Sequence, residues 1–171
     1  MLEKTISDYE VIGSTEYVNV AGNKQIPAKI DTGADSSAIW ASNIKMDENG
    51  VLTFTLFNEK SPFYTGKTIE TTEYQVKSVR SSHGDKQIRY HVQLSLTLGK
   101  QTFKTTFSLA NRSRNNFPIL IGRRTLSGRY LVDVSKSTVK RPKPKHTHQL
   151  NDEMKENPYK FYQKYMKQEK R

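Results

Sequence analysis

The residue best suited to chemistry in this chain is an aspartate in a short turn. Residues 28 to 37 read AKIDTGADSS, so Asp31 directly follows a strand-like apolar run. Gly33 permits a tight turn that a residue with a Cβ would resist, and the hydroxyl of Thr32 can brace such a turn. We therefore expect a carboxylate held at the end of a strand. The simpler alternative is an aspartate that only caps a turn between two strands.

One carboxylate cannot easily serve as general acid and general base in the same reaction. A symmetric dimer would bring two copies of Asp31 together on its two-fold axis. Two carboxylates in contact cannot both ionise easily, so the pair shares one proton, as in aspartic proteases. One oxygen can then deprotonate a water molecule while the other carboxyl polarises the substrate carbonyl. Asp31 is thus expected to be half of a hydrolytic site that a homodimer completes.

A second stretch, FPILIGRRTL at 117–126, runs from an apolar strand into Gly-Arg and then into a short helix. Together with AKIDTGADSSAIW, it resembles the active-site signature of the retropepsin-like aspartic proteases. The resemblance implies that Asp31 is catalytic, that Asp35 faces the substrate, and that Arg123 pairs with Asp35. It also implies that the active-site loop is supported by Thr32, Gly33, Ala34 and Arg123.

Between residues 11 and 134 the chain is similar to a bacterial family of small retropepsin-like endopeptidases, often labelled ATP-dependent zinc proteases. The matching stretches are EYVNV…IPAKIDTGADSSAIWA, VRSSHG and LANRSRNNFPILIGRRTL…YLVDV. Several members are associated with ligases that add glutamates to proteins, which implies an acidic or glutamate-rich peptide substrate. Arg124 stands where many retropepsins have Asn or Asp, and this departure bears on helix contacts and dimer packing.

The residues do not support either cofactor named in that label. The chain has no cysteine and no H-E-x-x-H, and its histidines lack an established ligand spacing. It also has no G-x-x-x-x-G-K-[ST] loop for nucleotide phosphates. We predict neither a metal nor a nucleotide cofactor.

The elements that must position these residues read as β-structure through residue 135. HVQLSLTL at 91–98 alternates between apolar and polar residues, which is typical of a half-buried strand. Further strands are expected at 16–20, 26–30, 51–57, 72–80, 86–92, 101–107, 117–121 and 129–134. We predict a mainly β protein, a retropepsin-like acid-protease barrel or sandwich, with a short helix after the Gly-Arg motif and a C-terminal helical tail.

A retropepsin also needs a hairpin flap that covers the cleft and excludes water. The best candidate is YQVKSVRSSHGDKQIRYHV, in which two strands flank SSHG. Four residues would then contact the substrate: Ser81, Ser82, His83 and Gly84. The alternative is an ordinary surface hairpin.

The composition changes at 140–149, where KRPKPKHTHQ reads as an extended linker. We expect a protease domain at 1–138 and a basic linker with a helical tail at 139–171. Residues 136–171 hold 11 Lys/Arg against 4 Asp/Glu, so much of the +11 formal charge belongs to the tail. This charge suggests nucleic acid or ribosomes as partners, or simply a solvated extension.

The N-terminus carries charges where a signal peptide needs an apolar run, and no apolar stretch of about 18 residues could span a bilayer. We expect a cytoplasmic protein with no membrane association. The sequence therefore predicts a homodimeric aspartic endopeptidase acting on a peptide or protein. Two other readings stay open: an inactive retropepsin-like module that binds peptides, and a nucleic-acid or ribosome-binding protein acting through its tail.

Overall fold

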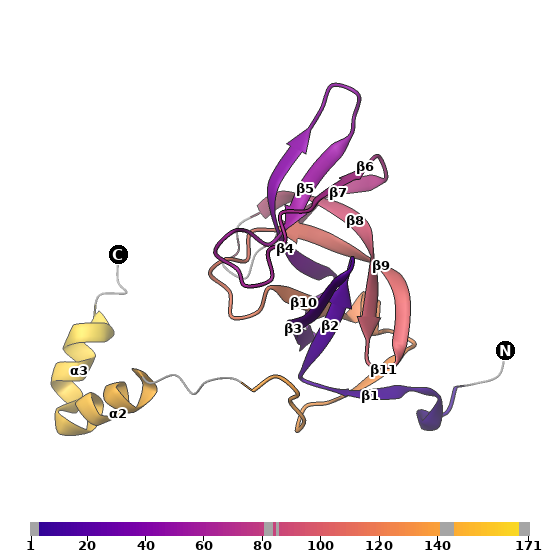
Figure 1. Cartoon of the computed structure of the whole chain (residues 1–171). Coiled ribbons are helices and arrows are strands. Elements are labelled where there is room, and N and C mark those ends of the chain that lie inside the picture. The colour runs from indigo at the N-terminus through magenta and orange to yellow at the C-terminus, as the bar shows by residue number, and fades with distance from the viewer. Residues whose placement is uncertain (1–3, 81–83, 85, 141–145, 168–171) are drawn as a thin grey trace. The chain divides into compact units, whose positions relative to one another are not determined.

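The computed structural model describes residues 4–80, 84, 86–140 and 146–167 (Figure 1). The chain divides into two compact units, Met1–Val139 and Lys140–Arg171. Each unit is described by itself.

The first unit is built mainly from strands, of which its described residues contain eleven. Their bounds are β1 (Glu10–Gly13), β2 (Thr15–Val20), β3 (Asn23–Asp31), β4 (Ser37–Met46), β5 (Leu52–Leu56), β6 (Thr68–Thr71), β7 (Tyr74–Arg80), β8 (Lys86–Leu98), β9 (Gln101–Ala110), β10 (Ile119–Gly122) and β11 (Tyr130–Asp133). A 3-10 turn at Ile6–Asp8 precedes them, and the short helix α1 (Arg123–Leu126) follows β10.

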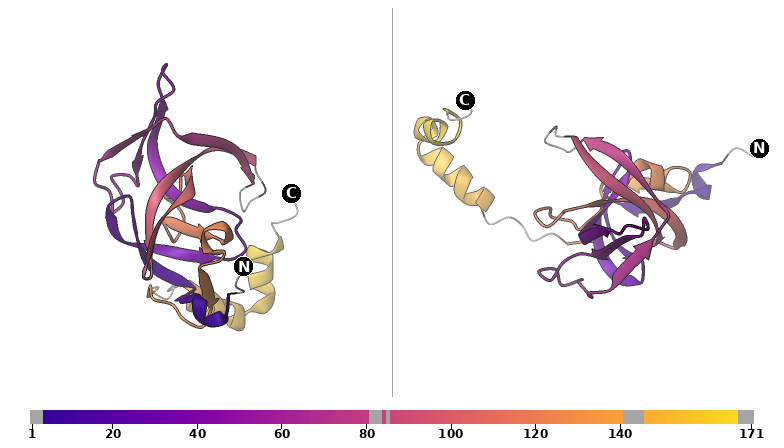
Figure 2. Two further views of the ribbon diagram at one scale, coloured as in Figure 1. Left: turned by 90° about the vertical axis from the view of Figure 1, so that its right-hand side faces the viewer. Right: turned by 90° about the horizontal axis from the view of Figure 1, so that it is seen from above.

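Six strands close into a barrel in the order β10-β3-β2-β8-β9-β4, because β4 pairs back onto β10. Strands β5 and β6 extend the sheet from β4, and β7 pairs with β8. Strands β1 and β11 form a separate two-stranded parallel sheet. Figure 2 shows the closed arrangement from two further directions. The mainly β barrel with a short helix after the Gly-Arg motif is confirmed.

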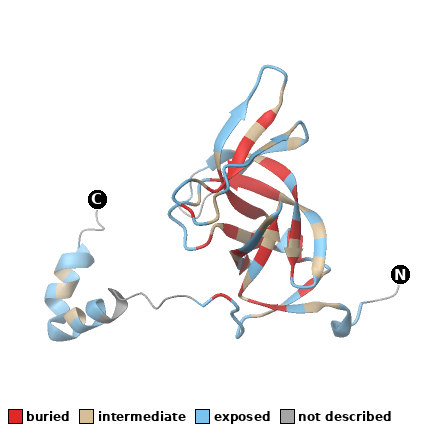
Figure 3. Cartoon of the chain, viewed as in Figure 1, coloured by how far each residue is buried: buried red, intermediate tan, exposed pale blue. Residues whose placement is uncertain are grey.

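Buried and exposed positions alternate along several strands (Figure 3), and most of the buried residues are apolar. In β8, Leu94 and Leu96 are buried, whereas Gln93 and Ser95 are exposed. Full burial of a leucine side chain stabilises the fold by about 1.5–3 kcal/mol. The period-two pattern seen in the sequence therefore marks one wall of the core.

The structure also contains strands that the sequence did not indicate. The largest is β4, whose first five residues are all buried and whose next five are not, so it lacks a period-two pattern. Its first half is buried on both faces. Strands β1 and β6 were also not expected, and the runs expected at 86–92 and 91–98 form the single strand β8.

The second unit contains two helices, α2 (His146–Glu156) and α3 (Pro158–Tyr165). The backbone N–H of Lys160 donates to Asn157 Oδ1 (2.9 Å), which caps the start of α3. Glu153 on α2 accepts hydrogen bonds from Lys164 Nζ (2.7 Å) and from the Tyr165 hydroxyl (2.9 Å) on α3. Helix α2 begins inside the expected linker, because no proline follows residue 144 before Pro158. None of the helices in the described residues has the length and apolar character needed to cross a membrane.

Candidate active site

Two parallel strands position the candidate catalytic carboxylate. Strand β3 ends at Asp31. The register partner of Asp31 in β10 is Gly122, the N-cap residue of α1. The preceding partners, Ile30 and Ile121, are both buried in the core. Since successive side chains of a strand point to opposite faces, the side chain of Asp31 points away from the barrel interior. It is 26% exposed.

The carboxylate of Asp31 is held by groups on its own strand and turn. The backbone N–H of Ala34 donates to the Asp31 carbonyl (3.2 Å), which closes a β-turn. Within this turn, the backbone N–H of Gly33 donates to Asp31 Oδ1 (3.2 Å). Lys29 Nζ lies 3.3 Å from Oδ2. The turn therefore gives this carboxylate a fixed orientation on the barrel surface.

In the structure, the turn does not require a glycine at Gly33, and the hydroxyl of Thr32 does not brace it, contrary to the expectation from the sequence. The backbone of Gly33 lies outside the left-handed region, and an added Cβ would meet nothing closer than Asp31 Oδ1 at 3.5 Å. A residue with a Cβ could therefore adopt this turn. Thr32 is exposed, and its hydroxyl has no hydrogen-bond partner among the described residues. Both residues form the outer surface of the loop.

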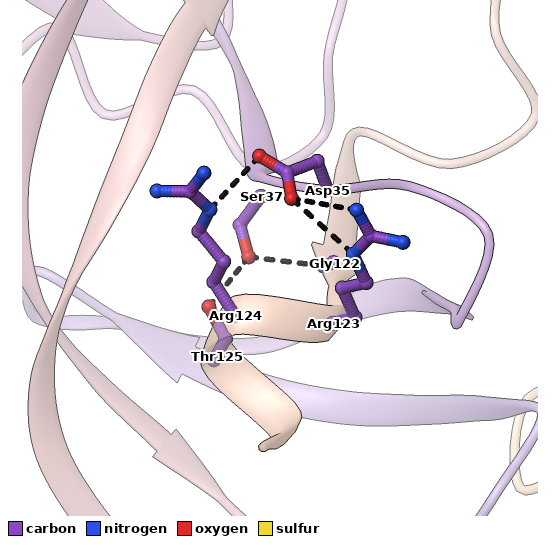
Figure 4. Close-up of polar contacts among 6 residues, drawn as sticks. All are labelled: Asp35, Ser37, Gly122, Arg123, Arg124 and Thr125. Atoms are coloured by element: carbon purple, nitrogen blue, oxygen red, sulfur yellow. Dashed lines mark hydrogen bonds and ion pairs between the residues drawn. The ribbon is translucent and has the colours of Figure 1, made fainter.

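The bracing comes instead from a buried hydroxyl network (Figure 4). Ser37 Oγ accepts from the backbone N–H of Gly122 (3.0 Å) and lies 2.7 Å from Thr125 Oγ1. A Cβ at Gly122 would come within 2.6 Å of the backbone carbon and oxygen of Ser36. The backbone N–H of Arg123 donates to the Ala34 carbonyl (2.8 Å). The loop after Asp31 is therefore packed directly onto the junction of β10 and α1.

Asp35 lies between two arginines (Figure 4). Arg123 donates from Nη2 (3.0 Å) and Nε (3.2 Å) to Oδ1, and Arg124 Nε lies 2.8 Å from Oδ2. Hydrogen bonds from Arg124 and then from Arg123 hold the pKa of Asp35 below its ordinary value. The structure thus shows the Arg123–Asp35 pair that the resemblance implied. Arg124, the departure from the family pattern, adds a second cation, and substrate contact by Asp35 stays a prediction.

The flap candidate is a long hairpin of β7 and β8, in which the register partners nearest its tip are Arg80 and Lys86 among the described residues. Gly84 has φ +88°, a conformation that favours glycine, and it is exposed. Ser81, Ser82 and His83 lie outside the described residues, so their contact with substrate stays a prediction.

Sequence reasoning missed a group of basic residues that lie within electrostatic range of one another, one of them also within range of Asp31. Arg112 follows β9, and Arg89 and His91 lie on β8. Their proximity depends on strand register, which no local motif reveals. As for metals, the described residues contain no group of three His, Cys, Asp or Glu side chains that could hold an ion.

A closed six-stranded barrel with an Asp-Thr-Gly turn packed on a Gly-Arg junction defines the retropepsin-like class. The family model described as retropepsin-like aspartic endopeptidase RimB matches residues 11–143, and the chain belongs to this RimB-like family. The resemblance read from the sequence is confirmed.

Curated relatives carry a different description. A probable alpha-L-glutamate ligase from Parasynechococcus marenigrum is 28% identical over 151 residues, and one from Shewanella pealeana is 29% identical over 133 residues. These matches cover 83% and 74% of this chain but only 29% of each relative, so the chain spans under a third of their length. A solved structure of a Legionella pneumophila protein of unknown function is 26% identical, with a TM-score of 0.55, covering 74% of this chain and 95% of that one.

Proposed function

We propose that the protein is an aspartic endopeptidase in which two Asp31 carboxylates, one from each chain of a homodimer, activate the water that attacks a peptide bond. The observation that carries this proposal is the position of Asp31, fixed at the end of β3 by its own turn and turned away from the core. The chain contains one Asp-Thr-Gly, whereas the chemistry requires two carboxylates.

The proposed mechanism uses the shared proton of the pair. The ionised carboxylate takes a proton from water, and the protonated carboxyl donates to the carbonyl oxygen as the C–O bond forms. Collapse of the tetrahedral intermediate breaks the C–N bond. The carboxyl that holds the proton gives it to the leaving amine, and a hydroxyl of the intermediate returns its proton to the other carboxylate, which restores the singly protonated pair. The Gly33 N–H at 3.2 Å and the Lys29 ammonium at 3.3 Å would stabilise the negative charge that the pair retains.

Exposed apolar residues support a second copy as the partner. Val11 of β1 and Leu131 of β11 are register partners and are 52% and 38% exposed. Val134, just after β11, is 81% exposed. The exposed Thr32 and Gly33 leave the loop surface open to contact from outside the chain. A homodimer would bury such surfaces.

The substrate class that we propose is an acidic or glutamate-rich peptide. The curated relatives are named as ligases of glutamate, and a peptidase acting on such products would run in the opposite chemical direction. The formal charge of +11 would attract an acidic chain.

Substitution of Asp31 by asparagine tests the proposal. We expect Asp31→Asn to lower turnover of a mixed library of acidic peptides about 10²–10⁴-fold while the circular dichroism spectrum stays unchanged. Asp152→Asn is the matched control, because Asp152 is exposed on α2, outside the first unit. A peptide-binding module without activity would instead show no turnover in the wild type and unchanged peptide affinity in Asp31→Asn.

A second candidate function, nucleic-acid binding by the tail, has its own support. Tyr159 and Tyr162 on α3 are 72% and 53% exposed, and Lys160 lies between them in the chain. Exposed aromatic rings beside cations suit base stacking on single-stranded nucleic acid. In the full chain, Tyr159→Ala with Tyr162→Ala should weaken binding of single-stranded RNA, with an affinity that falls steeply as salt rises. If RNA binding by this double variant were unchanged and insensitive to salt, the tail would be excluded as the RNA-binding segment.

A further inference from the structure

Strand register links the outer surface of β8, in the flap hairpin, to the outer surface of β3, the strand of Asp31. His91 of β8 is opposite Ser108 of β9, which pairs with Ala38 of β4. Ala38 is opposite Leu120 of β10, which pairs with Lys29 of β3. Register partners point to the same side of a sheet, so these side chains form one row around the outside of the barrel. The row ends at Lys29, two residues before Asp31, whose side chain also points outward.

Two partly buried arginines lie near His91: Arg89 on β8 and Arg112, two residues after the end of β9. Arg89 precedes His91 by two residues and donates only to Gln87 Oε1, at 2.7 and 3.2 Å. Arg112 donates from Nε to the Phe117 carbonyl (3.1 Å). Among the described residues, neither guanidinium forms an ion pair. A guanidinium that is partly withdrawn from water and has no ion-pair partner is a suitable group for binding an anion.

The two arginines and Asp31 lie within electrostatic range of one another. Burial, and after it the charge of Arg89, lowers the pKa of Arg112, whereas Asp31 acts in the opposite direction. The guanidinium of Arg112 is thus near both Arg89 and the candidate catalytic carboxylate. An anionic group of a substrate would relieve the repulsion between the two cations.

His91 adds an unused hydrogen-bonding group on the same strand as Arg89. Its side chain is 3% exposed, and both ring nitrogens are buried without a partner in the described part of the chain. Burial, followed by the charges of Lys77 and Arg89, lowers the pKa of His91 and keeps the ring neutral. A neutral imidazole can donate one hydrogen bond to a carboxylate.

We propose that Arg112, Arg89 and His91 form a carboxylate-binding subsite beside Asp31, with Arg112 as the specificity-determining residue. This rests on the proposed function, and it assigns the recognition of acidic substrate to particular side chains.

The bound carboxylate has two sources, a glutamate side chain or the α-carboxylate at the C-terminus of the peptide. A set of peptides separates them: glutamate replaced by glutamine at one position at a time, each with a free or amidated C-terminus. For the wild type we expect kcat/KM to fall at least about tenfold on loss of one carboxylate. A fall confined to one glutamine position assigns the side chain, and a fall confined to amidation assigns the terminus. Equal rates for all peptides would overturn the proposal without any protein variant.

Protein variants then test whether Arg112 is the residue that recognises the carboxylate. Arg112→Met should reduce the preference for the carboxylate towards a ratio of one, and Arg112→Lys should restore part of it through charge alone. Arg114→Met is the matched control, because Arg114 lies in the same loop but is exposed. A preference that survives Arg112→Met would refute the assignment.

Binding separates this proposal from the proposed function. Fluorescence anisotropy with a labelled glutamate peptide and its glutamine counterpart is measured on the full-length Asp31→Asn protein. Tighter binding of the glutamate peptide that Arg112→Met abolishes would support the subsite even if the wild type cleaved nothing. Equal affinity for both peptides would reject the subsite whether or not the wild type is a peptidase.

Discussion

Asp31 and Gly122 are register partners at the ends of two parallel strands, and the loop that starts at Asp31 returns to pack against Gly122. The Gly122 N–H donates to Ser37 Oγ, which ties the far end of this loop to the same point. The orientation of the candidate catalytic carboxylate therefore depends on a glycine 91 positions away in the chain, through contacts that leave no room for a Cβ.

Substitution of Gly122 should disturb this junction. In Gly122→Ala the new Cβ would meet the Ser36 backbone at 2.6 Å, so we expect a loss of about 1–3 kcal/mol in the free energy of unfolding, measured by urea titration. Gly33→Ala is the matched control, because the nearest atom would be 3.5 Å away. It should leave stability unchanged or raise it by about 0.4–1 kcal/mol. Equal destabilisation by both substitutions would contradict the described packing.

The ion pairs of Asp35 with Arg123 and Arg124 predict a pH-dependent contribution to stability. Because its pKa is lowered in the folded protein, the ionised carboxylate stabilises the fold above its ordinary pKa of 3.8, and this stabilisation is lost as pH falls through the folded pKa. Asp35→Asn should thus be less stable than the wild type at neutral pH, and the difference should vanish in acid and shrink in high salt. A difference in urea midpoint that is constant from pH 7 to pH 2 would exclude the ion pairs as its cause.

The buried imidazole of His91 predicts a second pH-dependent contribution to stability, at higher pH than that of Asp35. Its folded pKa is lowered, so the unfolded chain takes up a proton first, and stability falls as pH drops below the ordinary value of 6.5. The charged groups facing it are Lys77 on β7 and Arg89 on β8, and neither offers a counter-ion. His91→Gln should show a shallower decline in urea midpoint between pH 7.5 and pH 5. Parallel curves would show that His91 does not carry this effect.

Subunit mixing tests the shared site. When wild type is equilibrated with a ninefold excess of Asp31→Asn chains, most wild-type chains pair with a chain that lacks the carboxylate. Activity per wild-type chain should then fall about tenfold. Asp152→Asn chains, mixed in the same ratio, should leave it unchanged. Constant activity per wild-type chain in the Asp31→Asn mixture would mean that one chain holds a complete site.

The sequence predicted those parts of the site whose structure depends on residues that are neighbours in the chain. Asp31 in its turn, the strand before Gly122 and the helix after it were all predictable, because Asp-Thr-Gly and Ile-Leu-Ile-Gly-Arg combine apolar runs with turn residues. The pairing of Arg123 with Asp35 followed only from the resemblance, since residues 88 positions apart show no periodicity that links them.

The remaining features depend on tertiary contacts. Strand β4 was missed because its first half is buried on both faces and shows no alternation. Ser37 gave no sign that its hydroxyl would join Gly122 to Thr125, a link set by barrel closure. The approach of Arg112 to Arg89 requires the register of β8 and β9, which only the folded barrel fixes.

The central claim, a shared pair of Asp31 carboxylates, is tested most directly by the pH dependence of kcat/KM on one glutamate-containing peptide. The account predicts a bell for the wild type, with limbs that belong to the pair as a unit, and no measurable bell for Asp31→Asn. Full activity in Asp31→Asn would contradict it.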